Sequence, residues 1–580
     1  MRDLSLSAML MSPASLSGGT PAPSLQPPAT LLRAIEQSHN PSQLLAIRTA
    51  LTGRGVTLVQ GPPGTGKTKT ILGILSVLLA AEARRRAADA DDLAADALDA
   101  EGRPIMPGSF NASRPRPFET LEDSLPAGTE LGASERGKLL LRGAPWLSTA
   151  EYKPGYGTPA AAAPAAVEPR ARAPGQPAPL PPRPYPRACE TDAQIGLGRS
   201  LEEQPPKRVL VCAPSNAAID EIVSRLVGQA GRASGMLDAQ GEPTVPQVVR
   251  VGPNVKEDLL SYALDTLAKK RQQEKGGVEA MNYEVAKMSV LNEAAIVCTT
   301  LSCAGYTMFS QLGQGFDTVL VDEAAQAVEV STLIPLRYAC RRLILVGDPS
   351  QLPATVFSSY CTEKKYEQSL FQRLMIGGQR VAMLTTQYRM HPDISRFPSS
   401  RFYQGAISNA PRLDETCAAP WHARKACAPY VFYDVADATA VEASTSSWSN
   451  EMEGQLALAI VRFLLKEYPE RLLPASIGIV SPYNAQVRHI RKVFGEAFGA
   501  AIAGQIEVNS VDGFQGREKD IIILSCTRSD HHRDKHERRG VGFLRDSRRL
   551  NVSITRAKNS VFVLGTSPAT LTSRLGEVCA

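Results

Sequence analysis

The chain has 580 residues, of which 43% are hydrophobic and 21% are charged. This length is enough for two or three domains. Its net charge of +6 permits a nucleic-acid partner without requiring one, and the absence of any run of about twenty apolar residues argues against a membrane span. The ten cysteines contain no CxxC pair, so a reducing compartment and no structural metal are expected.

The N-terminal part is expected to contain a disordered segment and then a helical region. Residues 1–30 are rich in Ser, Pro and Ala and lack the basic and apolar regions of a signal peptide. Residues 31–51 are expected to be helical and contain Gln43, whose amide offers the donor and the acceptor that suit the edge of adenine. A surface glutamine on a helix is the alternative interpretation.

A glycine-rich segment at 61–68, GPPGTGKT, follows the apolar run 56–59 and precedes a helix with one apolar face. This order is typical of a phosphate-binding loop, because glycines let backbone N–H groups close around an anion at a helix N-terminus. Lys67 would then reach the β- and γ-phosphates of a nucleotide, and Thr68 would hold Mg²⁺. A Gly/Pro-rich turn before a core helix is the alternative, which the complete motif disfavours.

The composition changes sharply between residues 82 and 206, where Pro, Ala, Asp and Arg replace large apolar residues. Such a segment cannot bury enough apolar surface to offset its ordering entropy. We therefore expect a long low-complexity insertion that is mostly disordered, with a start that extends the preceding helix.

Strand-like runs then alternate with helical segments up to about residue 374, which predicts a parallel sheet covered by helices. Ser215 and Asn216 follow the first of these runs, at the edge where open α/β sheets bind ligands. The runs are 208–212, 248–252, 295–300, 318–321 and 343–346.

Paired carboxylates, Asp322 and Glu323, directly follow the run 318–321. Asp322 is placed to hold Mg²⁺ through its water shell, and Glu323 to orient or deprotonate the water that attacks the γ-phosphate. An acidic turn is the alternative, which the upstream phosphate loop disfavours. After the next strand, Gln351 could bridge the γ-phosphate to the opposite side of the site.

A second sheet is expected to begin at 381–384 and to include the runs 476–480, 520–525 and 560–564. Arg389 and Arg556 stand near strand ends, where each could stabilise charge on a transferred phosphate as an arginine finger. A surface salt bridge is the alternative for each.

A histidine-containing basic segment lies late in the chain. His531, His532 and His536 have no neighbouring cysteines, so a solvated loop is favoured over a metal site. The basic run 528–539, followed by Arg545, Arg548 and Arg549, either assists nucleic-acid binding or is a solvated loop.

Eight motifs, in the same order as in the family, resemble superfamily 1B helicases, and most closely the senataxin group of RNA/DNA helicases. Related groups are the nonsense-mediated-decay and the immunoglobulin-μ-binding helicases. The motifs are GPPGTGKT at 61–68, CAPSNAAIDEI at 212–222, VDEAAQ at 321–326, VGDPSQLP at 346–353, QYRMHP at 387–392, SPYNAQ at 481–486, VDGFQGREKDIIILSCTRS at 511–529 and GFLRDSRRLNVSITRAK at 542–558.

The resemblance implies an α/β fold of two tandem RecA-like domains, each a parallel sheet with helices on both faces. Domain 1 would comprise 31–81 and 207–374, with a prong-like helical segment at 253–292, and domain 2 would comprise 375–580. The resemblance further implies an ATP-dependent helicase or translocase, with ATP and Mg²⁺, that moves 5′ to 3′ along single-stranded RNA or DNA. It also implies that RNA–DNA hybrids are bound, that the protein is a monomer and that no membrane is a partner. The implied location is the nucleus, with the cytoplasm as the alternative.

The resemblance also implies roles for single residues. Gln43 would read adenine, Tyr483 would stack on it, and Glu518 would lie near the ribose. The other roles are phosphate binding by Gly61, Pro62, Pro63, Gly64, Thr65, Gly66, Lys67 and Thr68; handling of Mg²⁺ and water by Asp322 and Glu323; γ-phosphate contact by Gln351, Arg389 and Arg556; and a place near the single strand for Pro214, Ser215, Asn216, Thr299, Ser510 and Asp512.

One departure from the family bears on function. Family members carry a small β-barrel on a helical stalk, and the 60 residues ahead of Gly61 do not read as evenly spaced barrel strands. We expect the chain to lack the barrel or to be a fragment. The alternative function is therefore a nucleic-acid-binding regulatory module that hydrolyses ATP without unwinding. A metabolic P-loop kinase is disfavoured, because it leaves Arg389, Arg556 and the QYRMHP stretch unexplained.

Overall fold

The structure is a computed structural model of the chain. It describes residues 27–52, 55–96, 208–228, 233–274, 282–312, 315–338, 340–435, 440–444, 447–528 and 546–566. Most of the expected disordered N-terminus and of the expected insertion lies outside these residues, as do the three histidines 531, 532 and 536, Arg545, and all but the first residue of the basic run.

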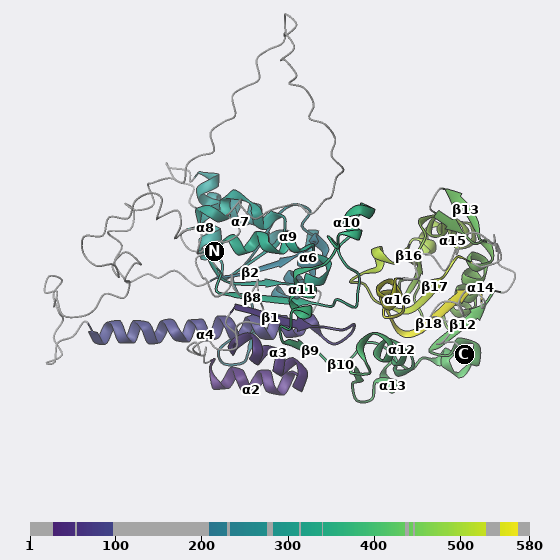
Figure 1. Cartoon of the computed structure of the whole chain (residues 1–580), viewed down its shortest axis with the longest axis horizontal. Coiled ribbons are helices and arrows are strands. Elements are labelled where there is room, and N and C mark those ends of the chain that lie inside the picture. Colours follow the sequence, from purple (N-terminus) through teal and green to yellow (C-terminus); the bar gives the residue numbers. More distant parts are fainter. Residues whose placement is uncertain are drawn as a thin grey trace, which may run out of the picture. The chain divides into compact units, whose positions relative to one another are not determined.

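A seven-stranded parallel sheet forms the first α/β domain, in the order β5-β6-β2-β7-β8-β1-β9. Figure 1 labels four of these strands, β2, β8, β1 and β9. Its strands are β1 (Gly55–Gln60), β2 (Arg208–Ala213), β5 (Val248–Val251), β6 (Ile296–Thr300), β7 (Phe316–Val321), β8 (Arg342–Gly347) and β9 (Val381–Met383). The sequence pattern explains the burial, since near-continuous apolar runs suit strands that are covered on both faces.

Separate apolar clusters cover the two faces of this sheet. Val59 of β1 packs in one cluster and Leu58 in the other, as the alternation of side chains along a strand requires. The helices of this part are α2 (Ala29–Ser38), α3 (Pro41–Thr52), α4 (Lys67–Asp96), α6 (Asn216–Val227), α7 (Leu264–Glu274), α8 (Tyr283–Glu293), α9 (Glu329–Leu333), α10 (Ser359–Glu363) and α11 (Leu370–Ile376). A hairpin is formed by β3 (Met236–Leu237) and β4 (Pro243–Thr244).

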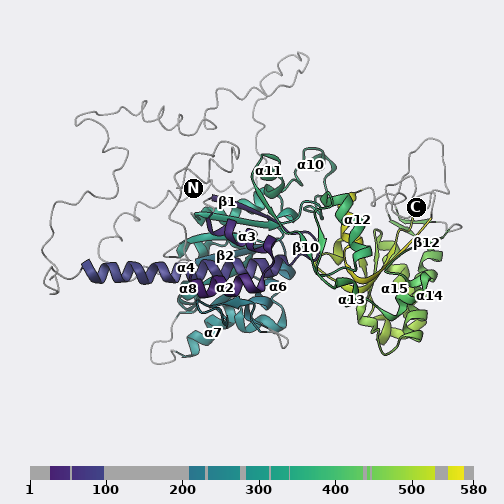
Figure 2. The same ribbon diagram turned by 90° about the horizontal axis from the view of Figure 1, so that it is seen from below.

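Three features of these helices bear on the expectations. The single helical region 31–51 is two helices, because Pro41 starts a new helix and cannot continue the previous one. Helix α4 continues to Asp96, so the start of the insertion extends the preceding helix as expected, and both views show α4 projecting beyond the sheet (Figures 1 and 2). The prong-like segment 253–292 is mainly helical, through η4 (Glu257–Tyr262), α7 and α8.

A five-stranded parallel sheet forms the second α/β domain, in the order β12-β18-β17-β15-β16. Along β17, Ile521 and Ile523 pack with α14 and α15, whereas Ile522 and Leu524 pack with α12 and α16. Its elements are α12 (Pro392–Tyr403), α13 (Leu413–Thr416), β12 (Tyr430–Asp434), α14 (Glu451–Glu467), β15 (Ile477–Ser481), α15 (Asn484–Ala503), β16 (Glu507–Ser510), β17 (Lys519–Ser525), α16 (Ser547–Ile554) and β18 (Ala557–Gly565). Two minor pairs are β10 (Thr386–Gln387) with β11 (Ser408–Asn409), and β13 (Val441–Ser444) with β14 (Ser447–Ser449).

The expectation that residues 381–384 begin the second sheet is wrong. β9 pairs in parallel with β1 at the edge of the first sheet, with Val381 opposite Leu58. The Leu384 N–H also donates to the carbonyl of Gln60, at 2.9 Å. A three-residue strand has no periodicity that assigns it to one sheet or another, and here the apolar face beside β1 is the one that it completes.

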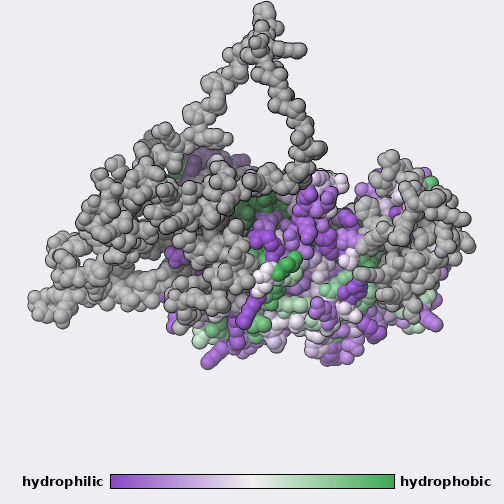
Figure 3. Space-filling view, in the orientation of Figure 1, coloured by the Kyte–Doolittle hydropathy of each residue, from purple (hydrophilic) through white to green (hydrophobic). Residues whose placement is uncertain are grey.

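The fold class is confirmed as two α/β domains with parallel sheets and helices on both faces. Where described atoms are visible in Figure 3, hydrophilic residues are interspersed with small hydrophobic patches, because most large apolar side chains lie inside. No helix among the described residues is both long and apolar enough to cross a membrane.

Candidate nucleotide and nucleic-acid site

The glycine-rich segment forms a loop between β1 and the start of α4. Gly64 and Gly66 have φ angles of +73° and +81°, a region that glycine enters without steric cost. A Cβ at Gly61 would lie 2.0 Å from Cγ of Lys67, so glycine there leaves room for the lysine. Because α4 begins at Lys67, the positive end of its dipole lies at this loop, which suits an anion.

Lys67 forms an ion pair with Glu323 across this loop. Its Nζ lies 2.9 Å from Oε1 of Glu323, and the two side chains are 16% and 20% exposed. Burial disfavours the charged lysine, but Glu323 and two nearby aspartates outweigh it, so the pKa of Lys67 is raised above its usual value. The lysine therefore remains a full positive charge for a phosphate.

Asp322 and Glu323 follow β7 in a strained turn. Glu323 has φ 49° and ψ 37°, a left-handed conformation that is costly for a non-glycine residue and is concentrated at functional sites. Burial, then the charge of Glu323, raises the pKa of Asp322 to about 7. Gln326 Nε2 donates to Oε2 of Glu323 at 2.7 Å, so both oxygens of this carboxylate have partners.

Gln43 joins the start of α3 to the phosphate loop. Its Oε1 accepts from the Asn40 N–H at 3.2 Å, while Asn40 Oδ1 accepts from the Gln43 N–H at 2.9 Å, a reciprocal capping arrangement. Gln43 Nε2 donates to the Thr65 carbonyl at 3.1 Å. Since Gln43 is 1% exposed, the surface-glutamine interpretation is wrong.

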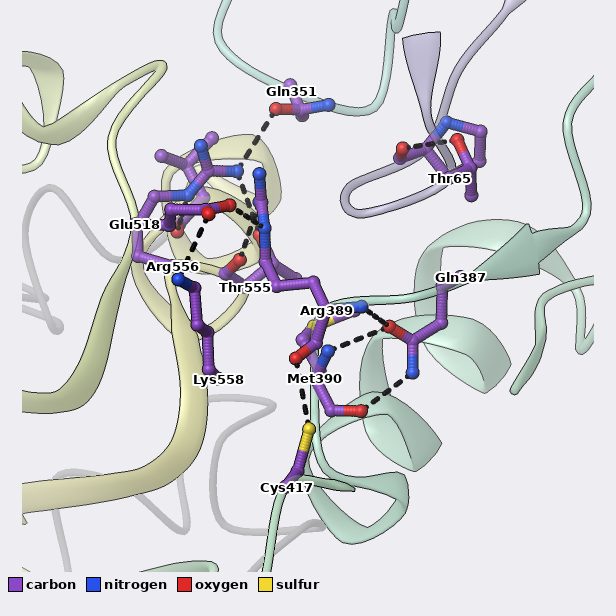
Figure 4. Close-up of polar contacts among 12 residues, drawn as sticks. Thr65, Gln351, Gln387, Arg389, Met390, Cys417, Glu518, Thr555, Arg556 and Lys558 are labelled. Carbon is purple, nitrogen blue, oxygen red and sulfur yellow. Dashed lines mark hydrogen bonds and ion pairs between the residues drawn. The ribbon is translucent and has the colours of Figure 1, made fainter. Parts of the chain in front are cut away.

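Gln351 and Arg556 meet although they lie 205 residues apart. Arg556 Nη2 donates to Gln351 Oε1 at 3.3 Å (Figure 4), and Gln351 Nε2 donates to Asp348 at 2.7 Å. Asp348 also accepts from the Tyr403 hydroxyl at 2.7 Å. Burial and the nearby Arg389 lower the pKa of Arg556 to about 9. Arg556 is 3% exposed, so its surface salt-bridge alternative is wrong.

Arg389 lies against the phosphate loop. The preceding Tyr388 N–H donates to the Gly64 carbonyl at 2.9 Å. Arg389 Nε lies 2.8 Å from Glu518, and its Nη1 donates to the Thr555 carbonyl at 3.2 Å (Figure 4). Burial opposes the charge on Glu518, but Arg389 and Lys558 outweigh it and lower the pKa of this carboxyl. Glu518, expected near the ribose, is here the partner of the arginine.

Tyr483 immediately precedes α15 and is 3% exposed. Protein therefore covers its ring, and stacking on a base would require this region to move.

The residues expected near the single strand differ in accessibility. Ser215 is exposed and caps α6 by accepting from the Ala218 N–H at 3.2 Å, with Pro214 just before it. Asp512 is exposed, 3.7 Å from Arg549, and the Ser510 hydroxyl accepts from the Gly513 N–H. Thr299 differs from the expectation, because it is fully buried and its hydroxyl donates inward to the Val251 carbonyl at 3.0 Å.

Sequence reasoning missed a buried ion pair behind Asn216. Arg250 is fully buried, its Nε lies 2.8 Å from Asp220, and its Nη2 donates to Asn216 Oδ1 at 2.9 Å. The guanidinium of Arg250 therefore holds the side-chain oxygen of Asn216 inward. The side-chain nitrogen, Nδ2, is the part of Asn216 left to donate to a ligand. The signal was an arginine inside the apolar strand VVRV together with an aspartate on the apolar side of a helix.

A buried carboxyl in the second domain was also missed. Glu453 on α14 is fully buried, and it accepts from the Ser525 hydroxyl at 2.6 Å and the Thr527 N–H at 2.9 Å. Burial raises its pKa to about 7. The sequence signal was the Asn450-x-x-Glu453 pattern before an apolar helix, which is typical of a capping box.

Comparison with known proteins shows what the chain is similar to. Two family models, each described as an AAA domain, match residues 38–107, 188–287 and 279–359, and residues 366–568. A probable helicase of Dictyostelium discoideum is 36% identical over 563 residues, which cover 93% of this chain and 52% of that protein. Helicase SEN1 of Saccharomyces cerevisiae is 32% identical, and the match covers 96% of this chain and 24% of SEN1. Probable helicase senataxin of Mus musculus is 34% identical, and the match covers 62% of this chain and 16% of senataxin.

The chain is similar to the senataxin-like helicases. It spans about half the length of the Dictyostelium relative and less of the other two. A solved arterivirus nonstructural protein 10 helicase, in complex with DNA, is 12% identical with a TM-score of 0.31, covering 65% of this chain and 57% of that one. A likeness that distant carries no argument about function, so the senataxin-like assignment rests on the sequence relatives and the motifs.

Proposed function

We propose that this senataxin-like chain is an ATP-dependent motor that moves 5′ to 3′ on single-stranded RNA or DNA, RNA–DNA hybrids included. The observation that carries the proposal is the meeting of Lys67, Asp322 and Glu323 at one glycine loop, with Arg389 packed against Gly64. The helicase names of its relatives support a nucleic-acid substrate, and the resemblance to senataxin supports a monomer in the nucleus.

The phosphate loop and Lys67 would bind the nucleotide. A polyphosphate would compete with Glu323 for Lys67, because both are anions and the loop adds backbone N–H groups. Once released, Glu323 would orient the attacking water or accept its proton.

Thr68 and Asp322 would hold Mg²⁺. The donor set fits a hard cation, since it consists of a hydroxyl and a carboxylate. The cation would neutralise charge on the β- and γ-phosphates.

Arg389, Arg556 and Gln351 would respond to the γ-phosphate. Arg389 is paired with Glu518 and Arg556 with Gln351, so a γ-phosphate would draw both guanidinium groups away from protein partners. Closure would then be favoured with the triphosphate and released after hydrolysis, because a ligand shifts an equilibrium only through differential contacts.

Strand binding would be directed mainly at the backbone. The segment Pro214 to Asn216 follows the carboxyl end of β2. Ser510 is the last residue of β16, and Asp512 lies two residues beyond it. Such contacts bind phosphates and sugars, so affinity should fall with salt and depend little on sequence.

The test is the ATPase rate with and without single-stranded RNA and DNA. Stimulation by either is expected, and no stimulation by either would refute the motor. A strand-displacement assay with a 5′ overhang then distinguishes a helicase from an ATP-hydrolysing binding module, which would be stimulated without displacing a strand.

A further inference from the structure

Three aromatic side chains are exposed in the segment that follows β8. Phe357 is 97% exposed, Tyr360 is 65% exposed and Tyr366 is 48% exposed. We call residues 354–366, which include α10, the aromatic loop. A phenylalanine ring surrounded by water lacks the free energy that burial would supply, so a ligand that covers it would gain that free energy.

We propose that the aromatic loop is a stacking platform for the bases of single-stranded nucleic acid, with Phe357 as its main contact. This inference rests on the proposed function and names residues that would hold the strand. Bases stack on aromatic side chains in a sequence-tolerant manner, which suits a motor that moves along any sequence.

The position of the aromatic loop agrees with such a role. The segment that leads into it, 348–353, leaves the carboxyl end of β8, and the segment Pro214 to Asn216 leaves the carboxyl end of β2. The sheet order β2-β7-β8 puts one strand between them, so the two strand ends lie about 10 Å apart. Both segments therefore start at the same edge of the sheet, where a single nucleic-acid strand could run past them.

Contacts also link the aromatic loop to the second domain. Glu367, which follows it, lies 3.4 Å from Arg548 on α16, and the next residue, Arg549, lies 3.7 Å from Asp512. The aromatic loop is thus connected through α16 to a second residue that is expected near the single strand.

The aromatic loop has a small excess of positive charge, two lysines against Glu363, whose carboxylate lies 3.9 Å from the Lys364 Nζ. Lys364 and Lys365 are both exposed, and the Lys364 Nζ lies 5.5 Å from the centre of the Tyr360 ring. Lysines beside exposed rings supply backbone neutralisation and base stacking together. A protein partner fits less well, because Ser358, Ser359 and Glu363 interrupt the apolar surface, whereas docking patches are contiguous.

The experiment measures the affinity of fluorescein-labelled dT and rU 20-mers by anisotropy, without nucleotide, at fixed salt. Phe357→Ala should weaken binding by about 5- to 150-fold, the equivalent of losing one stacked base. Phe357→Trp should restore wild-type affinity, and its added fluorescence should be quenched by either oligonucleotide. Ile376→Ala is the control, since Ile376 is 67% exposed but lies at the end of α11, outside the aromatic loop, and it should bind within about twofold of wild type.

Thermal melting checks that each variant is folded, which is expected because Phe357 makes almost no packing contacts. If the wild type binds the oligonucleotides and Phe357→Ala binds equally well, the stacking platform is overturned and the proposed function stands. If the wild type binds neither oligonucleotide, both are overturned.

Discussion

Lys67 and Glu323 hold each other at 2.9 Å, so the cation that would neutralise phosphate is paired with the carboxylate that would activate water. Each group is therefore the ion-pair partner of the other until a nucleotide binds. This pairing keeps two charges compensated in a site where both are mostly buried, and removing either one leaves the other unpaired.

Glu323→Gln should separate nucleotide binding from turnover. The amide removes the competing charge from Lys67 and cannot accept a proton, so binding should be retained or tightened while phosphate release falls by about 10²- to 10⁴-fold. Titration with a fluorescent nucleotide and a phosphate-release assay measure the two. Lys67→Ala is the matched comparison and should lose binding as well, and near-normal turnover by Glu323→Gln would contradict the assigned role.

Arg389→Ala should lower kcat by about 10³- to 10⁵-fold, the range for arginine fingers, with a smaller effect on nucleotide affinity. Arg389→Lys should not restore activity, because the planar guanidinium contacts Glu518 and the Thr555 carbonyl with separate nitrogens. Steady-state kinetics measure both. Arg412→Ala serves as the control, since Arg412 forms an exposed pair with Glu415; an equal loss there would remove the case for Arg389.

Arg250→Met should destabilise the first domain by about 3–5 kcal/mol, because Asp220 would remain as a buried charge without its partner. The double variant Arg250→Met, Asp220→Leu should recover much of this loss, since replacing a buried ion pair by apolar side chains is often neutral. Urea unfolding of both variants measures the difference. Equal stability of the single and double variants would show that the pair does not act as a unit.

Glu453 should make the second domain less stable as the pH rises. Its pKa is raised in the folded state, from 4.5 to about 7, so the folded protein binds the proton more tightly than the unfolded chain. Between about pH 4.5 and 7 the folded state progressively loses about 3 kcal/mol, and above pH 7 the full penalty applies. Glu453→Gln mimics the protonated acid, so its melting temperature should exceed that of the wild type at pH 8 and approach it at pH 5. A difference that does not vary with pH would contradict this.

The sequence predicted the fold class and that Lys67, Asp322 and Glu323 come together, because both depend on the local order of strands, turns and helices. A strand, a glycine turn and a helix fix where Lys67 lies, and the carboxylates after β7 necessarily reach the same edge of a parallel sheet. Features that depend on contacts between distant residues could not be predicted from the sequence. The sheet that receives β9 depends on an edge left open by β1, and the inward turn of the Thr299 hydroxyl depends on a carbonyl 48 residues away.

The placement of β9 has a mechanical consequence. β9 and β1 are adjacent, about 4.8 Å apart, and β1 leads into the phosphate loop while β9 leads toward Arg389. Arg389 is six residues beyond Met383, so this tether spans at most about 20 Å. Arg389, which would sense the γ-phosphate, is therefore joined by a six-residue segment to β9, and β9 is the neighbour of the strand that leads into the phosphate loop. When the second sheet moves, Arg389 can therefore move relative to the nucleotide only within the reach of this segment.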